Sequence, residues 1–125
     1  MLKVKENNLI ELTRGDCATF TITTKDDDGN DYMFQIGDVI RFAIYKKGNM
    51  NETKLLKEVE VSQETLEVEI ELSTDDTKLD NIINKPVDYW YEVTLNPTTN
   101  AHTIIGYDDI SGAKIFRLYP EGVDE

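Results

Sequence analysis

The chain has few of the residues from which small proteins build disulfides and metal sites. Its 125 residues include one cysteine, Cys17, and one histidine, His102. A lone cysteine cannot close an internal disulfide, which excludes a disulfide-stapled secreted scaffold. No second histidine or cysteine is available to share a metal ion with His102. We therefore expect no metal, no cofactor and no catalytic residue.

Positive charge is also scarce. Thirteen lysines and arginines stand against 25 aspartates and glutamates, giving a net charge of −12. Such a charge opposes attraction to phosphates and anionic lipid, so we expect neither nucleic acid nor a membrane as partner. No apolar run approaches the roughly 20 residues of a membrane span, and lysines interrupt the first residues where a signal peptide needs an apolar stretch. We expect synthesis in the cytoplasm.

What the sequence does contain is period-two alternation, the pattern of β-strands. Residues 18–23 alternate apolar side chains with threonines, and residues 66–72 alternate them with Glu67, Glu69 and Glu71. Each of these segments predicts a strand with one dry face and one wet face. The three glutamates then form a water-facing stripe, with Lys54 or Lys57 as possible neighbours.

Further strands are predicted by the same pattern and by β-branched or aromatic residues. Residues 40–45 and 89–95 have a less polar second face and should be central in a sheet. Shorter candidates cover residues 9–12, 55–61, 102–107 and 114–119. Glycine, asparagine and proline mark the turns between them.

The sequence therefore predicts one domain over residues 1–125, an all-β, immunoglobulin-like antiparallel β-sandwich of about eight strands. The apolar phases of the strands predict the core residues Phe20, Ile22, Ile40, Phe42, Val68, Ile70, Tyr91 and Val93. One short helix is expected over residues 73–79, because Ser73 or Thr74 can cap a helix whose first turn carries Asp75 and Asp76.

Six short motifs are distributed over residues 12–106, most of the chain, and their order and spacing carry a resemblance. The motifs are Leu12-Thr13-Arg14-Gly15-Asp16, Ala18-Thr19-Phe20-Thr21-Ile22, Val39-Ile40-Arg41-Phe42-Ala43-Ile44, Leu72-Ser73-Thr74-Asp75-Asp76-Thr77, Tyr89-Trp90-Tyr91-Glu92-Val93-Thr94-Leu95 and Thr103-Ile104-Ile105-Gly106. Together they resemble the amino-terminal β-sandwich of upper baseplate proteins and related tail or neck components of bacteriophages and prophages.

This resemblance implies a structural module of a virion or tail-like particle, with other tail or baseplate proteins, or copies of itself, as partners. It brings no catalytic residues. Upper baseplate proteins usually continue into a long carboxy-terminal region, whereas this chain stops after its last predicted strand. The chain is thus either a standalone tail component or an excised domain.

Two short motifs are similar to known binding motifs, one for integrins and one for calcium, but the details of each favour a structural role. Arg14-Gly15-Asp16 is the tripeptide that integrins recognise, but a glycine between two predicted strands fits a tight turn. The acidic run at residues 26–31 is similar to a calcium loop, but it has aspartate at the sixth position, where an EF-hand needs glycine. We expect a turn and a solvated hairpin loop.

Candidate interface residues come from the aromatic and acidic segments. Three consecutive aromatics at residues 89–91 must point to both faces of a strand, so Trp90 either packs beneath a loop or the short helix or anchors an interface. We take Trp90 and Tyr119, with the stripe Glu67, Glu69 and Glu71, as the candidate interface. The alternative function is an adhesion or carbohydrate-binding sandwich that uses the loops between strands. A small hydrolase lacks an acid, base and nucleophile set.

Overall fold

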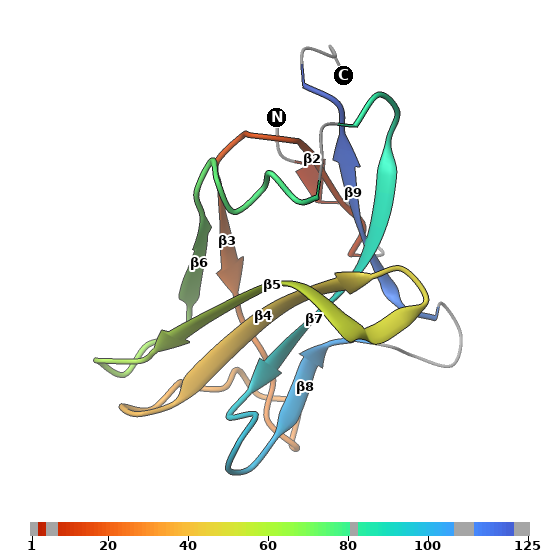
Figure 1. Cartoon of the computed structure of the whole chain (residues 1–125). Coiled ribbons are helices and arrows are strands. Elements are labelled where there is room, and N and C mark those ends of the chain that lie inside the picture. Colours follow the sequence, from red (N-terminus) through yellow and green to blue (C-terminus); the bar gives the residue numbers. More distant parts are fainter. Residues whose placement is uncertain (1–2, 5–7, 81–82, 107–111, 122–125) are drawn as a thin grey trace.

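The structure, a computed structural model, describes residues 3–4, 8–80, 83–106 and 112–121. These residues form strands and no helix, which confirms the predicted all-β class (Figure 1). The strands are β1 (Lys3–Val4), β2 (Ile10–Thr13), β3 (Ala18–Ile22), β4 (Val39–Lys46), β5 (Asn49–Glu60), β6 (Val68–Leu72), β7 (Val87–Leu95), β8 (His102–Ile105) and β9 (Lys114–Tyr119). Tyr107, expected at the end of a strand, lies outside the described residues.

The strands form two sheets of unequal size. The larger has the order β1-β2-β9-β7-β4-β5, with β8 also paired to β7, and the smaller consists of β3 and β6. Strands β4 and β7 are central, as their less polar second faces predict. Every strand pair is antiparallel except β2 and β9, which run parallel. The expected purely antiparallel arrangement is wrong at that one pair.

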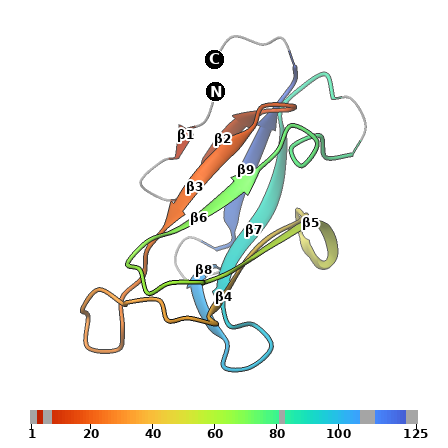
Figure 2. The same cartoon turned by 90° about the vertical axis from the view of Figure 1, so that its left-hand side faces the viewer.

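The two sheets pack face to face through the apolar phase of each strand. Seen from the side of the smaller sheet, β3 and β6 lie in front of β9 and β7 (Figure 2). In β3 and β6 alternate residues are buried and exposed along the whole strand. All eight predicted core residues are buried, the most exposed being Phe20 at 7%. The alternation therefore identifies the face of β3, β4, β6 and β7 that enters the core.

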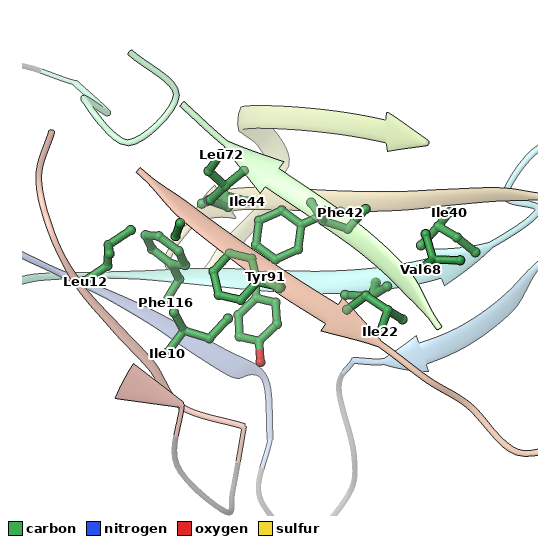
Figure 3. Packing of buried hydrophobic residues seen from close by; sticks show 14 of the residues in the cluster. Ile10, Leu12, Ile22, Ile40, Phe42, Ile44, Val68, Leu72, Tyr91 and Phe116 are labelled. Carbon is green, nitrogen blue, oxygen red and sulfur yellow. The ribbon is translucent and has the colours of Figure 1, made fainter. Parts of the chain in front are cut away.

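Phe42 lies where aromatic rings from both sheets meet (Figure 3). Its ring stacks on Phe20 of the smaller sheet and on Tyr91 of the neighbouring strand β7, each at a centroid distance of 5.6 Å. Phe116 of β9 meets it edge-on at 6.5 Å. Offset stacking and edge contacts are the favourable arrangements of aromatic rings, so Phe42 joins strands that are distant in sequence.

The short helix expected over residues 73–79 is a hydrogen-bonded turn instead. The capping signal itself is present, because the Ser73 amide donates to Asp76 Oδ2 at 2.8 Å and the Asp76 amide donates to Ser73 Oγ at 3.2 Å. The chain then leaves helical geometry, with Leu79 buried in the core and Asp80 at a positive φ of 56°. A capping sequence that is not followed by apolar residues at helical spacing forms a single turn and does not continue as a helix.

The strand predicted over residues 66–72 begins later than expected, at Val68. Thr65 Oγ1 donates to the Glu67 carbonyl at 2.9 Å and accepts from the Glu67 amide at 3.2 Å. This local bonding occupies the backbone of Glu67, and Leu66 is left 44% exposed. Leu66 is therefore a surface residue, although the alternation predicts it in the core.

Truncation of Phe42 tests the importance of this aromatic contact. Phe42→Ala should lower the free energy of unfolding by about 3–5 kcal/mol, since it removes a 1% exposed ring and leaves a cavity. Urea denaturation followed by circular dichroism measures the change. The control Ile36→Ala removes a side chain that is 71% exposed and should change it by less than about 0.5 kcal/mol. Equal effects of the two substitutions would contradict the assignment of the core.

Candidate interface

The outer face of the larger sheet carries a row of aromatic and apolar side chains around Trp90. Tyr89 and Tyr91 are each 3% exposed and point into the core, so Trp90 between them points outward and is half-buried. Trp90 is paired in register with Tyr45 of β4 on one side and with Ile115 of β9 on the other. Residues in register share a face, so Trp90 lies between these two side chains.

The apolar surface continues toward β5. Leu56 is paired in register with Ala43 and is 48% exposed, whereas Ala43 beside it is fully buried. We call Ala43, Tyr45, Leu56, Trp90 and Ile115 the outer apolar face. Isolated exposed apolar residues are ordinary, but several aromatic and aliphatic side chains on one face of a sheet suit a binding surface.

Charged pairs border the outer apolar face. Arg41 lies 2.9 Å from Glu58, and Arg117 Nε donates to Asp88 Oδ1 at 2.7 Å. The Tyr45 hydroxyl donates to Glu92 Oε1 at 3.0 Å. Burial, followed by this hydrogen bond to a carboxylate, raises the pKa of Tyr45 to about 12. An apolar centre with a polar rim is the usual anatomy of a protein interface.

Tyr119 lies on the same outward phase of β9 as Ile115, at the end of the strand. It is half-buried, and its hydroxyl donates to the Glu11 carboxylate of β2. That hydrogen bond, with burial second, raises the pKa of Tyr119. Tyr119 lies four positions after Ile115 along the strand, a distance of about 13 Å. The structure thus places Trp90 and Tyr119 on one face of the sheet, at a distance from each other.

The acidic stripe lies elsewhere. Glu69 and Glu71 point outward from the smaller sheet, paired in register with Thr21 and Thr19, and Glu67 precedes the strand. Of the two expected neighbours, Lys54 pairs with Asp80 and Glu52 instead. Lys57 lines a hollow together with Glu71, but its ion pair is with Asp76 at 3.0 Å. Because β6 belongs to the smaller sheet and β7 and β9 to the larger one, the structure does not bring the stripe together with Trp90 and Tyr119.

Arg14-Gly15-Asp16 forms the expected turn. The Arg14 side chain is folded against the protein, 2.5 Å from Glu121, and the residue is 8% exposed. Gly15 has a φ of +90°, a conformation that favours glycine. Its amide donates to Thr77 Oγ1 at 3.0 Å, and that hydroxyl donates to the Asp16 carbonyl at 2.8 Å. With the arginine buried, the tripeptide does not display its two charges to a receptor.

The acidic run at residues 26–31 is an exposed hairpin loop, as expected. Asp26 Oδ1 accepts hydrogen bonds from the Asp28 and Asn30 amides, each at 3.0 Å. Lys25 forms an ion pair with Asp31 across the base of the loop. The Asp26 carboxylate thus caps backbone amides of its own loop.

Next to this loop is a hollow of about 310 Å³ whose lining includes Asp26, Tyr32 and His102. His102 is exposed, as is Cys17 in the turn before β3. Within the described part of the chain, no three His, Cys, Asp or Glu side chains are grouped closely enough to hold a metal ion. The described residues likewise include no helix that could cross a membrane.

Comparison with known proteins yields no relative. No family model matches the chain, and no curated protein or solved structure matches it.

The residues that surround Trp90 were not evident in the sequence. Tyr45, Leu56 and Ile115 come from three other strands, and their position beside Trp90 depends on strand order and register. The only local signal is the phase of each residue, since each is an apolar or aromatic side chain at an outward position. Such positions are recognisable only once the neighbouring strands are known.

The hydrogen bond between Tyr45 and Glu92 should be visible at high pH. The folded pKa lies above the ordinary value of 10.0, so the neutral hydroxyl stabilises the fold below that pH. This contribution is lost as the pH rises through about 12. We expect NMR titration of the Tyr45 ring to give a midpoint near 12 in wild type and a lower one in Glu92→Gln. The remote variant Glu60→Gln should leave it unchanged, and equal midpoints in all three proteins would contradict the contact.

Removal of metal or of the thiol should not affect stability. Because Cys17 is exposed and no metal cluster is present among the described residues, neither a chelator nor Cys17→Ser should shift Tm by more than about 2 °C. Differential scanning calorimetry measures both. A chelator-induced fall of many degrees would instead indicate a cation held by the loop at residues 26–31.

Proposed function

We propose that the chain is a non-enzymatic structural module that assembles into a bacteriophage or prophage tail particle of the baseplate type through protein contacts. The observation that carries the proposal is the outer apolar face, where Leu56 is 48% exposed in a surface shared with Trp90, Tyr45 and Ile115. The order of the sequence motifs, which resembles phage tail sandwiches, supplies the biological setting.

The composition of this face favours a protein partner. Tryptophan and tyrosine are enriched among residues that contribute most to binding, because a rigid ring buries a large area at a small entropic cost. The ion pairs Arg41–Glu58 and Arg117–Asp88 lie around the apolar centre and can fix the orientation of the partner. Tyr119 would contribute at the periphery, beside Glu11.

Assembly in a tail particle implies repeated copies. The proposal therefore includes a closed homo-oligomer or a tight complex with another tail or baseplate protein, located in the virion. It also includes the finer description of the fold as an immunoglobulin-like sandwich, which two facing sheets support and the parallel β2–β9 pair departs from.

The alternative function, adhesion or carbohydrate binding, retains one supporting observation. The hollow of about 310 Å³ beside the loop at residues 26–31 contains Tyr32, and an aromatic side chain can stack on a sugar. Glycan binding that is lost in Tyr32→Ala, and that leaves the protein monomeric, would favour this alternative over assembly.

Substitution of the exposed leucine provides the main test. Light scattering should detect a complex over a wide concentration range, either with the chain alone or with the products of adjacent genes. Leu56→Arg should weaken that complex at least about tenfold, because it places a charge within the outer apolar face. Trp90→Ala should act in the same direction, and Tyr119→Ala more weakly.

The matched control is Leu66→Arg, the same substitution at a leucine that is 44% exposed away from the outer apolar face. It should leave association unchanged. Circular dichroism of each variant separates loss of contact from loss of fold. Monomers in every mixture, or equal effects of Leu56→Arg and Leu66→Arg, would overturn the proposal.

A further inference from the structure

In the described part of the chain, the smaller sheet has an edge at β3 that no strand pairs with. Strand β3 is hydrogen-bonded to β6 on one side, and no strand among the described residues pairs with its other side. An edge strand presents a row of backbone amides and carbonyls that can bind a further strand. The edge is not shielded by a proline or by a charged side chain on β3, whose outward residues are Thr19 and Thr21.

A groove runs beside the carboxyl end of this edge. It has a volume of about 450 Å³ and is lined by Ile104 and Ile105, by the segment from Thr21 to Lys25, and by Asn8. Ile22 is 5% exposed, and Ile104 and Ile105 are half-buried and packed against the core. Figure 3 shows Ile22 at the end of β3. Every second side chain of a strand added here would point toward the side of the sheet on which Ile104 and Ile105 lie.

The opposite face of an added strand would meet negative charge. Thr19 and Thr21 stand in register with Glu71 and Glu69, so an incoming residue lies two strand spacings, about 9.6 Å, from these carboxylates. Threonine is short, and a lysine or arginine can extend across it to the carboxylate. Among the described residues neither glutamate has an ion-pair partner.

We propose that the β3 edge binds an extended segment of another protein in which basic and apolar residues alternate. The apolar residues fill the groove beside Ile104 and Ile105, the basic residues reach Glu69 and Glu71, and the backbone continues the smaller sheet. At this edge a second copy of the chain is disfavoured, because it would bring a net charge of −12 toward Glu69 and Glu71, whereas the outer apolar face lies on the other sheet. The inference rests on the proposed function only in that the partner is a protein.

The test uses the full chain and two synthetic peptides with blocked ends. One alternates the residues, Lys-Val-Arg-Val-Lys-Ile-Arg, and the other has the same composition with basic and apolar residues in separate blocks. We expect the alternating peptide to bind and to slow amide hydrogen exchange within residues 18–22, as backbone pairing requires. The block peptide should bind more weakly and protect none of these amides.

Isosteric variants identify the charge contribution. Glu69→Gln combined with Glu71→Gln should weaken binding of the alternating peptide about threefold to tenfold, as expected for two exposed ion pairs. Glu60→Gln combined with Glu64→Gln changes the net charge equally at two exposed residues outside the smaller sheet and should have no effect. Leu56→Arg should also leave peptide binding unchanged. The binding site at the β3 edge and the outer apolar face are thus tested independently of each other.

Three results would overturn the proposal. The first is equal binding of both peptides, which would indicate general attraction between opposite charges. The second is absence of binding by the alternating peptide. The third is protection of residues 18–22 that increases with protein concentration when no peptide is present, which would assign the edge to a second copy.

Discussion

The contact of Phe42 with Phe20 and Tyr91 is the interaction on which the rest of the structure depends. A two-stranded sheet is at best marginally stable in water, and β3 with β6 has no hydrogen-bonded partner among the other described strands. Its stability must therefore come from burial against the larger sheet. The ring of Phe20 stacks on Phe42 at an interplanar angle of 13°, which fixes the smaller sheet at one position over the larger one. Both proposed binding surfaces exist because this packing leaves them outside.

The inner and outer faces of the larger sheet are set by the same register. On β4, Phe42 points inward and Tyr45 outward, and on β7 Tyr91 points inward and Trp90 outward. A shift of one residue would exchange the two sets of side chains and place Trp90 in the core. The burial of Phe42 and Tyr91 thus also determines that Tyr45, Trp90 and Ile115 are presented together. The register that stabilises the core therefore also decides which side chains form the outer apolar face.

Much of the fold could be predicted from the sequence, because alternation is a local property. It identified the core face of β3, β4, β6 and β7, including Phe42 and Ile70, and placed Trp90 on the opposite face of its strand from Tyr91. The parallel pairing of β2 with β9 could not be predicted, since no local pattern records which strands meet. Residues 73–79 form a turn and not the expected helix, because the hydrogen bonds between Ser73 and Asp76 that cap a helix can also close a single turn. Of the candidate interface, Trp90 and Tyr119 share a face, whereas Glu69 and Glu71 belong to the other sheet and Glu67 directly precedes it.

The parallel pair of β2 and β9 has a consequence for the order in which the domain can fold. Ile10 and Phe116 are neighbours in the sheet, although they lie near opposite ends of the chain. Phe116 also completes the ring cluster around Phe42. During synthesis, β2 therefore has no partner on this side until residues 114–119 have left the ribosome, at about 5–20 residues per second. Pairing across such a sequence separation closes a long loop, so the domain should fold late and slowly as one unit rather than hairpin by hairpin.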